Sequence, residues 1–219
     1  MISTMKNEHL TYYNSTEERL NVLTHAIGLV LSIIALVVLI IHANNHGTAR
    51  HIVSFSIFGA SLILLYSAST FYHYSQKPEL RKKLNILDHA AIYVLIAGTY
   101  TPFTLITLKG TLGWTIFGIT WGIALVGVFL KLFYTGRFEK ISTAAYIGMG
   151  WIIIFAVKPL LENLPINGLY WLLAGGVFYT VGAILYSIPK IKYNHTIFHV
   201  FVLLGSFSHF MAIYFYVLQ

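Results

Sequence analysis

Long apolar blocks separated by short polar segments make up most of the chain. Seven blocks are long enough to cross a bilayer, which takes about 20 predominantly apolar residues. Within a block such as IGLVLSIIALVVLII, apolar residues do not alternate with polar ones as they would in a barrel strand. Helices also satisfy their own backbone hydrogen bonds in lipid. We therefore predict an all-α integral membrane protein, a seven-transmembrane helix bundle with spans at residues 20–41, 52–74, 86–107, 112–133, 141–160, 168–188 and 196–218.

The composition agrees with this pattern. Of the 219 residues, 57% are hydrophobic and 10% are charged, whereas soluble domains average about 25% charged residues. The polar segments are too short for a separate soluble domain. We expect a cytoplasmic N-terminal tail at residues 1–19 and a single transmembrane domain at residues 20–218, in the cell (plasma) membrane. The chain has no cysteine, so it can form no disulfide and no thiolate metal site.

The basic residues predict the orientation. The net charge of +7 would suggest nucleic acid on a soluble protein, but here the cations lie between apolar blocks and no nucleic-acid partner is expected. Cytoplasmic loops of membrane proteins carry the excess of Lys and Arg. Seven spans place eleven cations on one side and three on the other, which puts the N-terminus in the cytoplasm and the C-terminus outside. The eleven are Lys6, Arg19, Lys77, Arg81, Lys82, Lys83, Lys131, Arg137, Lys140, Lys190 and Lys192; the three are Arg50, Lys109 and Lys158.

Two local features predict how the helices pack. Pro102 in AGTYTPF should kink the third span, because proline lacks the backbone N–H that the helix needs. Gly118 and Gly122 form a small-xxx-small pair on the fourth span, which is typical of close helix contact in membranes.

One acidic residue opens a span. Asp88 lies in NILDHAAIYVLIAG at the start of the third block. An ionised residue costs about 2.5–3.5 kcal/mol at the bilayer centre and less near an interface, so a carboxylate in a span is a functional candidate. The alternative is an interfacial aspartate stabilised by the positive N-terminal end of a helix dipole.

Histidines supply the other candidate site. His195 and His199 are four residues apart at the start of the seventh span, so both imidazoles lie on one helix face and could supply two nitrogen ligands to a metal. His73 ends the second span, and Ser69 lies one turn before it. With seven spans, Ser69, His73, Asp88 and the histidine pair share one depth near the cytoplasmic leaflet. Three neutral histidines with an open position are typical of catalytic zinc.

The remaining histidines are weaker candidates. His42, His46 and His51 fall in HANNHGTARH, which we interpret as a polar external loop with doubtful helical register. His25 and His209 lie within spans and are interpreted as packing or hydrogen-bonding residues. His89 adjoins Asp88 but should point about 100° away from it on a helix.

Four motifs, in order along the chain, carry a family resemblance. They are EERLNVLTHAIG, SASTFYH, LDHAAIYVLIAGTYTPF and HTIFHVFVLLGSFSHF. The chain resembles the hemolysin III family, the bacterial branch of the progestin and adipoQ receptor (PAQR) superfamily, over essentially its whole length. The resemblance implies a seven-helix bundle with a cytoplasmic N-terminus. It also implies a zinc ion bound by the matching residues His73, His195 and His199, with Ser69 and Asp88 beside it.

The resemblance further implies a reaction. The superfamily is similar to the alkaline ceramidases, which suggests hydrolysis of a ceramide-like membrane lipid amide. Asp88 would then act as general base, and Ser69 would position water or steady the oxyanion. Two alternatives stay open: a membrane-damaging, pore-forming cytolysin, as the family name implies, and a non-catalytic sensor or transporter with structural zinc. The sequence does not reveal the oligomeric state.

Overall fold

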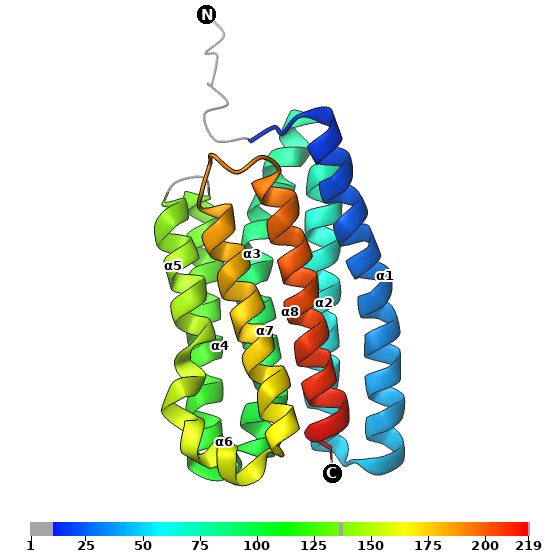
Figure 1. Cartoon of the computed structure of the whole chain (residues 1–219), viewed down its shortest axis with the longest axis vertical. Helices are drawn as coiled ribbons and strands as arrows, with labels where there is room; N and C mark the ends of the chain where they lie inside the picture. Colours follow the sequence, from blue (N-terminus) through cyan, green and yellow to red (C-terminus); the bar gives the residue numbers. More distant parts are fainter. Residues whose placement is uncertain (1–10, 136–137, 219) are drawn as a thin grey trace, which may run out of the picture.

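The computed structural model describes residues 11–135 and 138–218, and these form a bundle of helices (Figure 1). Seven helical stretches are long and apolar enough to cross a membrane, which confirms the predicted fold class. The helices are α1 (Ser15–His46), α2 (Ala49–Tyr74), α3 (Pro78–Pro102), α4 (Gly110–Tyr134), α5 (Glu139–Gly150), α6 (Val157–Asn163), α7 (Ile166–Tyr186) and α8 (Asn194–Tyr216). Two short helices of other types lie between these α-helices: the π-helix η1 (Phe103–Thr107) after α3, and the 3₁₀-helix η2 (Ile152–Ala156) between α5 and α6.

Two of the seven spans are composite. The third joins α3 to η1, and the fifth joins α5, η2 and α6. At Pro102 the α-helical hydrogen-bond pattern ends, and the backbone N–H of Leu108 donates to the carbonyl of Phe103 at 2.8 Å. Proline removes one helical donor, and the wider π-helical turn η1 follows it directly.

The first helix is longer than the predicted span. It begins at Ser15 rather than at residue 20, because the side chain of Asn14 accepts a hydrogen bond from the backbone N–H of Glu17 at 3.0 Å and caps the helix. It also continues to His46, so the expectation of an irregular loop at His42 and His46 is wrong.

The expected close contact at Gly118 and Gly122 is also wrong. Within the described part of the chain, a Cβ built at either glycine meets no atom within 4 Å. Close approaches on α4 occur instead at two other glycines. A Cβ built at Gly113 would overlap the carbonyl oxygen of Thr104, and one built at Gly127 would lie 2.6 Å from ring atoms of Tyr93 on α3. Hydropathy therefore predicted the helix correctly, but Gly118 and Gly122 do not lie on the face that packs against other helices.

The third span is the most enclosed. In its most apolar window 83% of the residues are buried, compared with 22% in α1, whose outer face exposes Val30, Ile34 and Val37. Such apolar exposure suits a helix that faces lipid tails. The chain packs α1 on α2, α2 on α3, α3 on α4 and α7 on α8, and α1 also contacts α8.

Four helix ends that carry the candidate residues meet at one end of the bundle. In Figure 1, α1 and α8 begin where α2 ends and α3 begins. We call this the N-terminal end. Its location on the cytoplasmic side of a membrane stays a prediction. Lys6 and Arg137, which contribute to the charge count, lie outside the described residues.

Candidate metal centre

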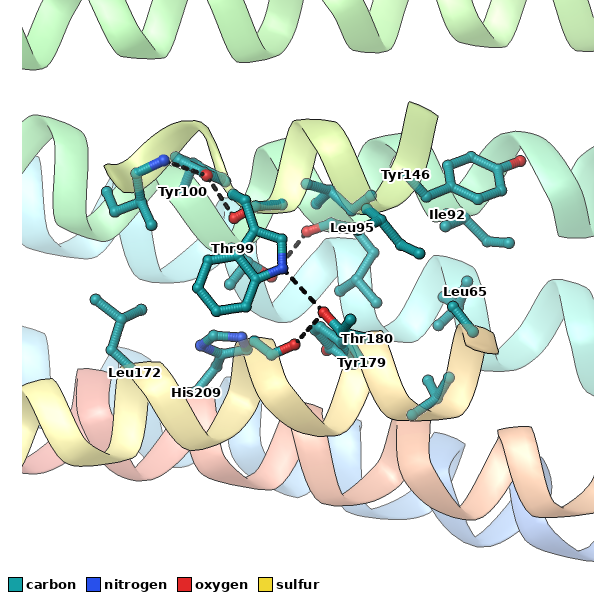
Figure 2. A pocket seen from close by; sticks show the side chains of 18 of the residues that line it. Leu65, Ile92, Leu95, Thr99, Tyr100, Tyr146, Leu172, Tyr179, Thr180 and His209 are labelled. Atoms are coloured by element: carbon teal, nitrogen blue, oxygen red, sulfur yellow. Dashed lines mark hydrogen bonds between the residues drawn. The ribbon is translucent and has the colours of Figure 1, made fainter. Parts of the chain in front are cut away.

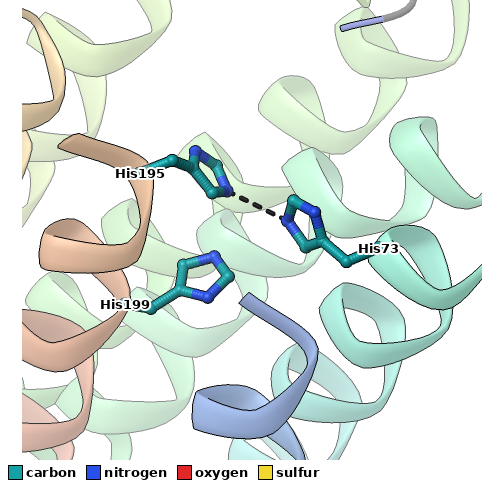
Figure 3. A group of neighbouring side chains, drawn as sticks. All are labelled: His73, His195 and His199. Carbon is teal, nitrogen blue, oxygen red and sulfur yellow. Dashed lines mark hydrogen bonds between the residues drawn. The ribbon is translucent and has the colours of Figure 1, made fainter. Parts of the chain in front are cut away.

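Three histidines meet at the N-terminal end of the bundle (Figure 3). His73 comes from the last turn of α2, and His195 and His199 come from the first turns of α8. One ring nitrogen from each lies within 4.8 Å of the others, and the Nε2 atoms of His73 and His195 are 3.0 Å apart. All three side chains are buried. The structure thus brings together the three predicted ligands, a group that could hold a metal ion.

Each of the three rings is held through its other nitrogen. Nδ1 of His73 is 2.7 Å from Oε2 of Glu18, and Nδ1 of His195 is 3.0 Å from the hydroxyl of Tyr13. Nδ1 of His199 is 3.2 Å from Oγ1 of Thr24. Histidine ligands of metals usually have such an outer partner, which fixes the ring and its tautomer.

The spacing of the nitrogens also fits a metal. Two nitrogens at about 2.0–2.1 Å from a tetrahedral zinc ion are roughly 3.3 Å apart, close to the 3.0 Å between the Nε2 atoms of His73 and His195. With their Nδ1 atoms occupied by outer partners, the rings offer Nε2 to the shared centre. The residues present therefore fit a bound divalent ion.

Glu18 is a site residue that the sequence reasoning missed. It was assigned to the N-terminal tail, but it lies in the first turn of α1 and contacts His73. Glu18, Asn21 and His25 are spaced i, i+3 and i+7, which places them on one helix face. That spacing was visible in EERLNVLTHAIG and could have indicated that α1 borders the site.

Arg81 is one of the eleven cations counted on the predicted cytoplasmic side, but its side chain is buried inside the protein. It is fully buried in α3, pairs with the carboxylate of Glu18 and donates to the backbone carbonyl of Tyr72 at 3.2 Å. Its guanidinium also lies over the rings of Tyr12 and Tyr72, at 4.5 and 4.6 Å from their centroids. A buried cation requires such partners, so Arg81 links α3 to α1, to α2 and to the segment before α1.

Asp88 and Ser69 border the histidine group. Both are buried and line the adjoining cavity, and Asp88 lies close enough to His73 and Ser69 to interact with both. The structure therefore brings these two polar groups to the site, while their catalytic roles stay predictions.

Two further histidines lie near the centre. His25 stacks on His199 with ring centroids 3.5 Å apart and an interplanar angle of 10°. Neither nitrogen of His25 has a hydrogen-bond partner in the described part of the chain. His89 is bonded through Nδ1 to the carbonyl of Asn85 at 2.9 Å, yet it lines the same cavity as Asp88. His25, interpreted from the sequence as a packing or hydrogen-bonding residue, thus packs directly on a candidate ligand.

The alternative trio does not form a comparable group. The rings of His42 and His46 are 5.4 Å apart on α1, whereas His51 accepts a hydrogen bond from the backbone N–H of Thr48 at 3.1 Å and caps α2. Among residues 11–135 and 138–218, only His73, His195 and His199 meet the geometric conditions for a metal group.

A cavity of about 430 Å³ adjoins the metal centre. Figure 2 shows some of the side chains that line it. Its wall includes His195 and His199 near one end and His209 farther along α8. Ten residues of helix separate the last two, or about 15 Å along the axis. Most of the wall is apolar, with side chains such as Leu65, Ile92 and Leu172. The cavity therefore joins a polar site to an apolar channel inside the bundle.

A membrane-spanning bundle with a buried three-histidine group defines a class: heptahelical membrane proteins with a candidate intramembrane metal centre. The family model described as Haemolysin-III related matches residues 13–210, and the chain belongs to this family. It is a multi-pass protein of the cell membrane.

Individual relatives agree with this assignment. The chain is 54% identical over 202 residues to Hemolysin-3 of Bacillus cereus, covering 92% of each chain. It is 52% identical over 200 residues to the Hemolysin-3 homolog of Bacillus subtilis (strain 168), covering 91% of this chain and 94% of the relative. It is also 27% identical over 206 residues to the human Monocyte to macrophage differentiation factor, covering 91% and 84%. This distant similarity supports the wider PAQR relationship.

Proposed function

We propose that the chain is a zinc-dependent hydrolase that cleaves a lipid amide or ester, with ceramide-like amides as the first substrate class to test. The observation that carries the proposal is the position of three buried histidine nitrogens, within 4.8 Å of one another, beside a largely apolar cavity of about 430 Å³. Ligand sites of small molecules typically enclose about 300–1,000 Å³. A lipid could place its polar linkage at the histidines and an acyl chain along the cavity.

The donor set favours zinc. His73, His195 and His199 provide three nitrogens and no thiolate, the pattern of zinc sites that keep an open position. When bound there, zinc would supply Lewis-acid chemistry, lowering the pKa of water to about 7 and polarising a carbonyl. Asp88 would bring a negative charge close to the cation.

The residues around the centre have complementary roles in this proposal. Asp88 is the general base that takes a proton from the attacking water and later returns one to the leaving group. Ser69 donates a hydrogen bond that orients the water or stabilises the oxyanion. Both residues line the cavity, so both could reach a substrate carbonyl. With the predicted orientation, the reaction takes place near the cytoplasmic leaflet.

The first experiment measures metal content and turnover together. Purified wild-type protein should contain about one zinc per chain and release fatty acid from ceramide. His199→Ala should lose both, because it removes one of three ligands. The matched control is His46→Ala, which removes an exposed histidine from the opposite end of the bundle and should change neither. Bound zinc with no turnover on any lipid amide or ester would contradict the hydrolase and favour a sensor or transporter with a structural metal.

Membrane damage is the second candidate function. It is favoured by the name of the relative from Bacillus cereus, Hemolysin-3. Against it, the chain already has seven spans, whereas secreted pore-forming toxins travel as soluble proteins. Dye leakage from liposomes that is unchanged by chelators and by His73→Ala would support a pore. Leakage that requires His73 and lipid hydrolysis would make the damage a consequence of catalysis, and no leakage at any protein-to-lipid ratio would exclude it.

A further inference from the structure

His209 lies in the wall of the cavity, far from the metal centre. It is on α8, ten residues or about 15 Å beyond His199. The side chain is buried, with 5% of its surface exposed, and it appears among the lining side chains in Figure 2. A polar side chain within a membrane span is costly and needs a physical reason.

The polar side chains near His209 have partners within the protein. Thr180 donates to the carbonyl of Gly176 at 2.7 Å and accepts from the indole N–H of Trp151 at 3.0 Å. The hydroxyl of Tyr179 is 2.9 Å from Oγ of Ser206. Thr99 and Tyr100, on the facing helix, each donate to a backbone carbonyl. These hydrogen bonds join neighbouring helices and give the polar side chains around His209 partners within the protein.

His209 differs from these neighbours. Its ring packs beside Tyr179, with centroids 5.4 Å apart, but Nδ1 has no hydrogen-bond partner among the described residues. Leaving a buried polar group unpaired costs about 1–3 kcal/mol. A phenylalanine would provide the same packing without that cost, so packing alone does not account for an imidazole here.

The fold also makes room for this ring. A Cβ built at Gly175 would lie 2.5 Å from Nε2 of His209, so any larger residue on α7 would displace the imidazole. The absence of a side chain at Gly175 lets the ring lie against the helix and border the cavity. His209 is therefore built into the cavity wall as a polar group whose Nδ1 has no partner among the described residues.

We propose that His209 is a specificity residue that hydrogen-bonds a polar group carried partway along the lipid chain whose carbonyl lies at the metal centre. This inference rests on the proposed function, because it assumes that the cavity receives that chain. An extended chain advances roughly 1.2 Å per bond, as a peptide backbone does, so about 15 Å corresponds to about 12 bonds. The ligand class is a long-chain acyl lipid with a hydroxyl or keto group near carbon 12.

The first test measures binding without turnover. Displacement of a fluorescent fatty acid from the purified, nanodisc-reconstituted protein compares 12-hydroxystearic, 2-hydroxystearic and stearic acids. One neutral hydrogen bond contributes about 0.5–1.5 kcal/mol, or roughly 2- to 12-fold in affinity. Wild type should bind the 12-hydroxy acid about fivefold more tightly than stearic acid, with no such gain for the 2-hydroxy acid. Equal binding of the 12-hydroxy and stearic acids would overturn the inference.

The second test replaces the imidazole. His209→Phe should keep or improve the affinity for stearic acid and lose the preference for the 12-hydroxy acid. A preference that survives in this variant would overturn the role of His209. The positional comparison in wild type remains decisive if the variant does not fold.

Turnover separates this inference from the proposed hydrolase. Hydrolysis of N-stearoyl and N-(12-hydroxystearoyl) sphingosine is measured with the same preparations. A binding preference without hydrolysis of either lipid would support the His209 site and contradict the proposed reaction. Hydrolysis of both lipids with equal efficiency and equal binding would support the reaction and overturn the His209 site.

Discussion

The carboxylate of Glu18 joins two buried groups at the metal centre. One oxygen is 2.7 Å from Nδ1 of His73, and the other pairs with the guanidinium of Arg81. The first contact orients a candidate ligand, and the second neutralises a buried cation. Removing the negative charge therefore affects metal binding and packing together.

Glu18→Gln should weaken zinc binding about 10- to 100-fold, the usual effect of losing an outer partner of a histidine ligand. Competition with a calibrated chelator measures the affinity of the purified variant. Glu79→Gln is the matched control, because Glu79 is an exposed acid at the same end of the bundle. Unchanged zinc affinity in the Glu18 variant, with the protein folded, would contradict the assigned role.

The contrast between Asp88 and Glu18 shows which residues of the candidate site can be predicted from the sequence. Asp88 stands out in the sequence because a carboxylate inside an apolar block is unusual. Glu18 does not stand out, because it precedes the first apolar block. Hydropathy does not reveal that the capped helix begins before this block and includes Glu18. His73, His195 and His199 were found because helical spacing and depth suffice to predict that they meet. The orientation of each ring depends on Tyr13, Thr24 and Glu18, which only the folded chain brings together.

At the scale of helices, α4 approaches the third span at two glycines, Gly113 beside Thr104 of η1 and Gly127 beside Tyr93 of α3. Gly127 lies beneath the ring of Tyr93, whereas Gly118 and Gly122 face open space in the described structure. A small-xxx-small pair indicates that close contact is possible, but hydropathy cannot identify which face of an apolar helix is turned toward lipid. The span boundaries, in contrast, follow from apolar length and were predicted closely for most helices.

Gly127→Ala should destabilise the protein by about 1–3 kcal/mol, the usual cost of overpacking a core, because the new methyl group would lie 2.6 Å from a rigid ring. Gly118→Ala is the matched control on the same helix. It should be neutral or stabilising by up to about 1 kcal/mol, since alanine favours a helix over glycine. Thermal unfolding in detergent measures both. Equal stability of the two variants would contradict the assigned contact between α3 and α4.

At the scale of the whole molecule, the number of spans decides whether a metal centre can exist. α2 ends, and α3 and α8 begin, at the same end of the bundle. One span fewer between His73 and His195 would place them on opposite sides of the bilayer. The seven-span topology and the histidine group therefore support each other. The side of the membrane on which that end lies is predicted from the charge asymmetry and the family resemblance, and a separate experiment can test it.

The chain has no cysteine, so single cysteines can report the orientation without background. Lys83 is exposed at the N-terminal end of the bundle, and Asn45 is exposed near the other end of α1. If the cationic end is cytoplasmic, Asn45→Cys should react with a membrane-impermeant maleimide in intact cells. Lys83→Cys should react only after permeabilisation. The reverse pattern would place the histidine group near the outer leaflet and contradict the predicted orientation. Labelling of both sites in intact cells would contradict the single membrane crossing by α2 that separates them.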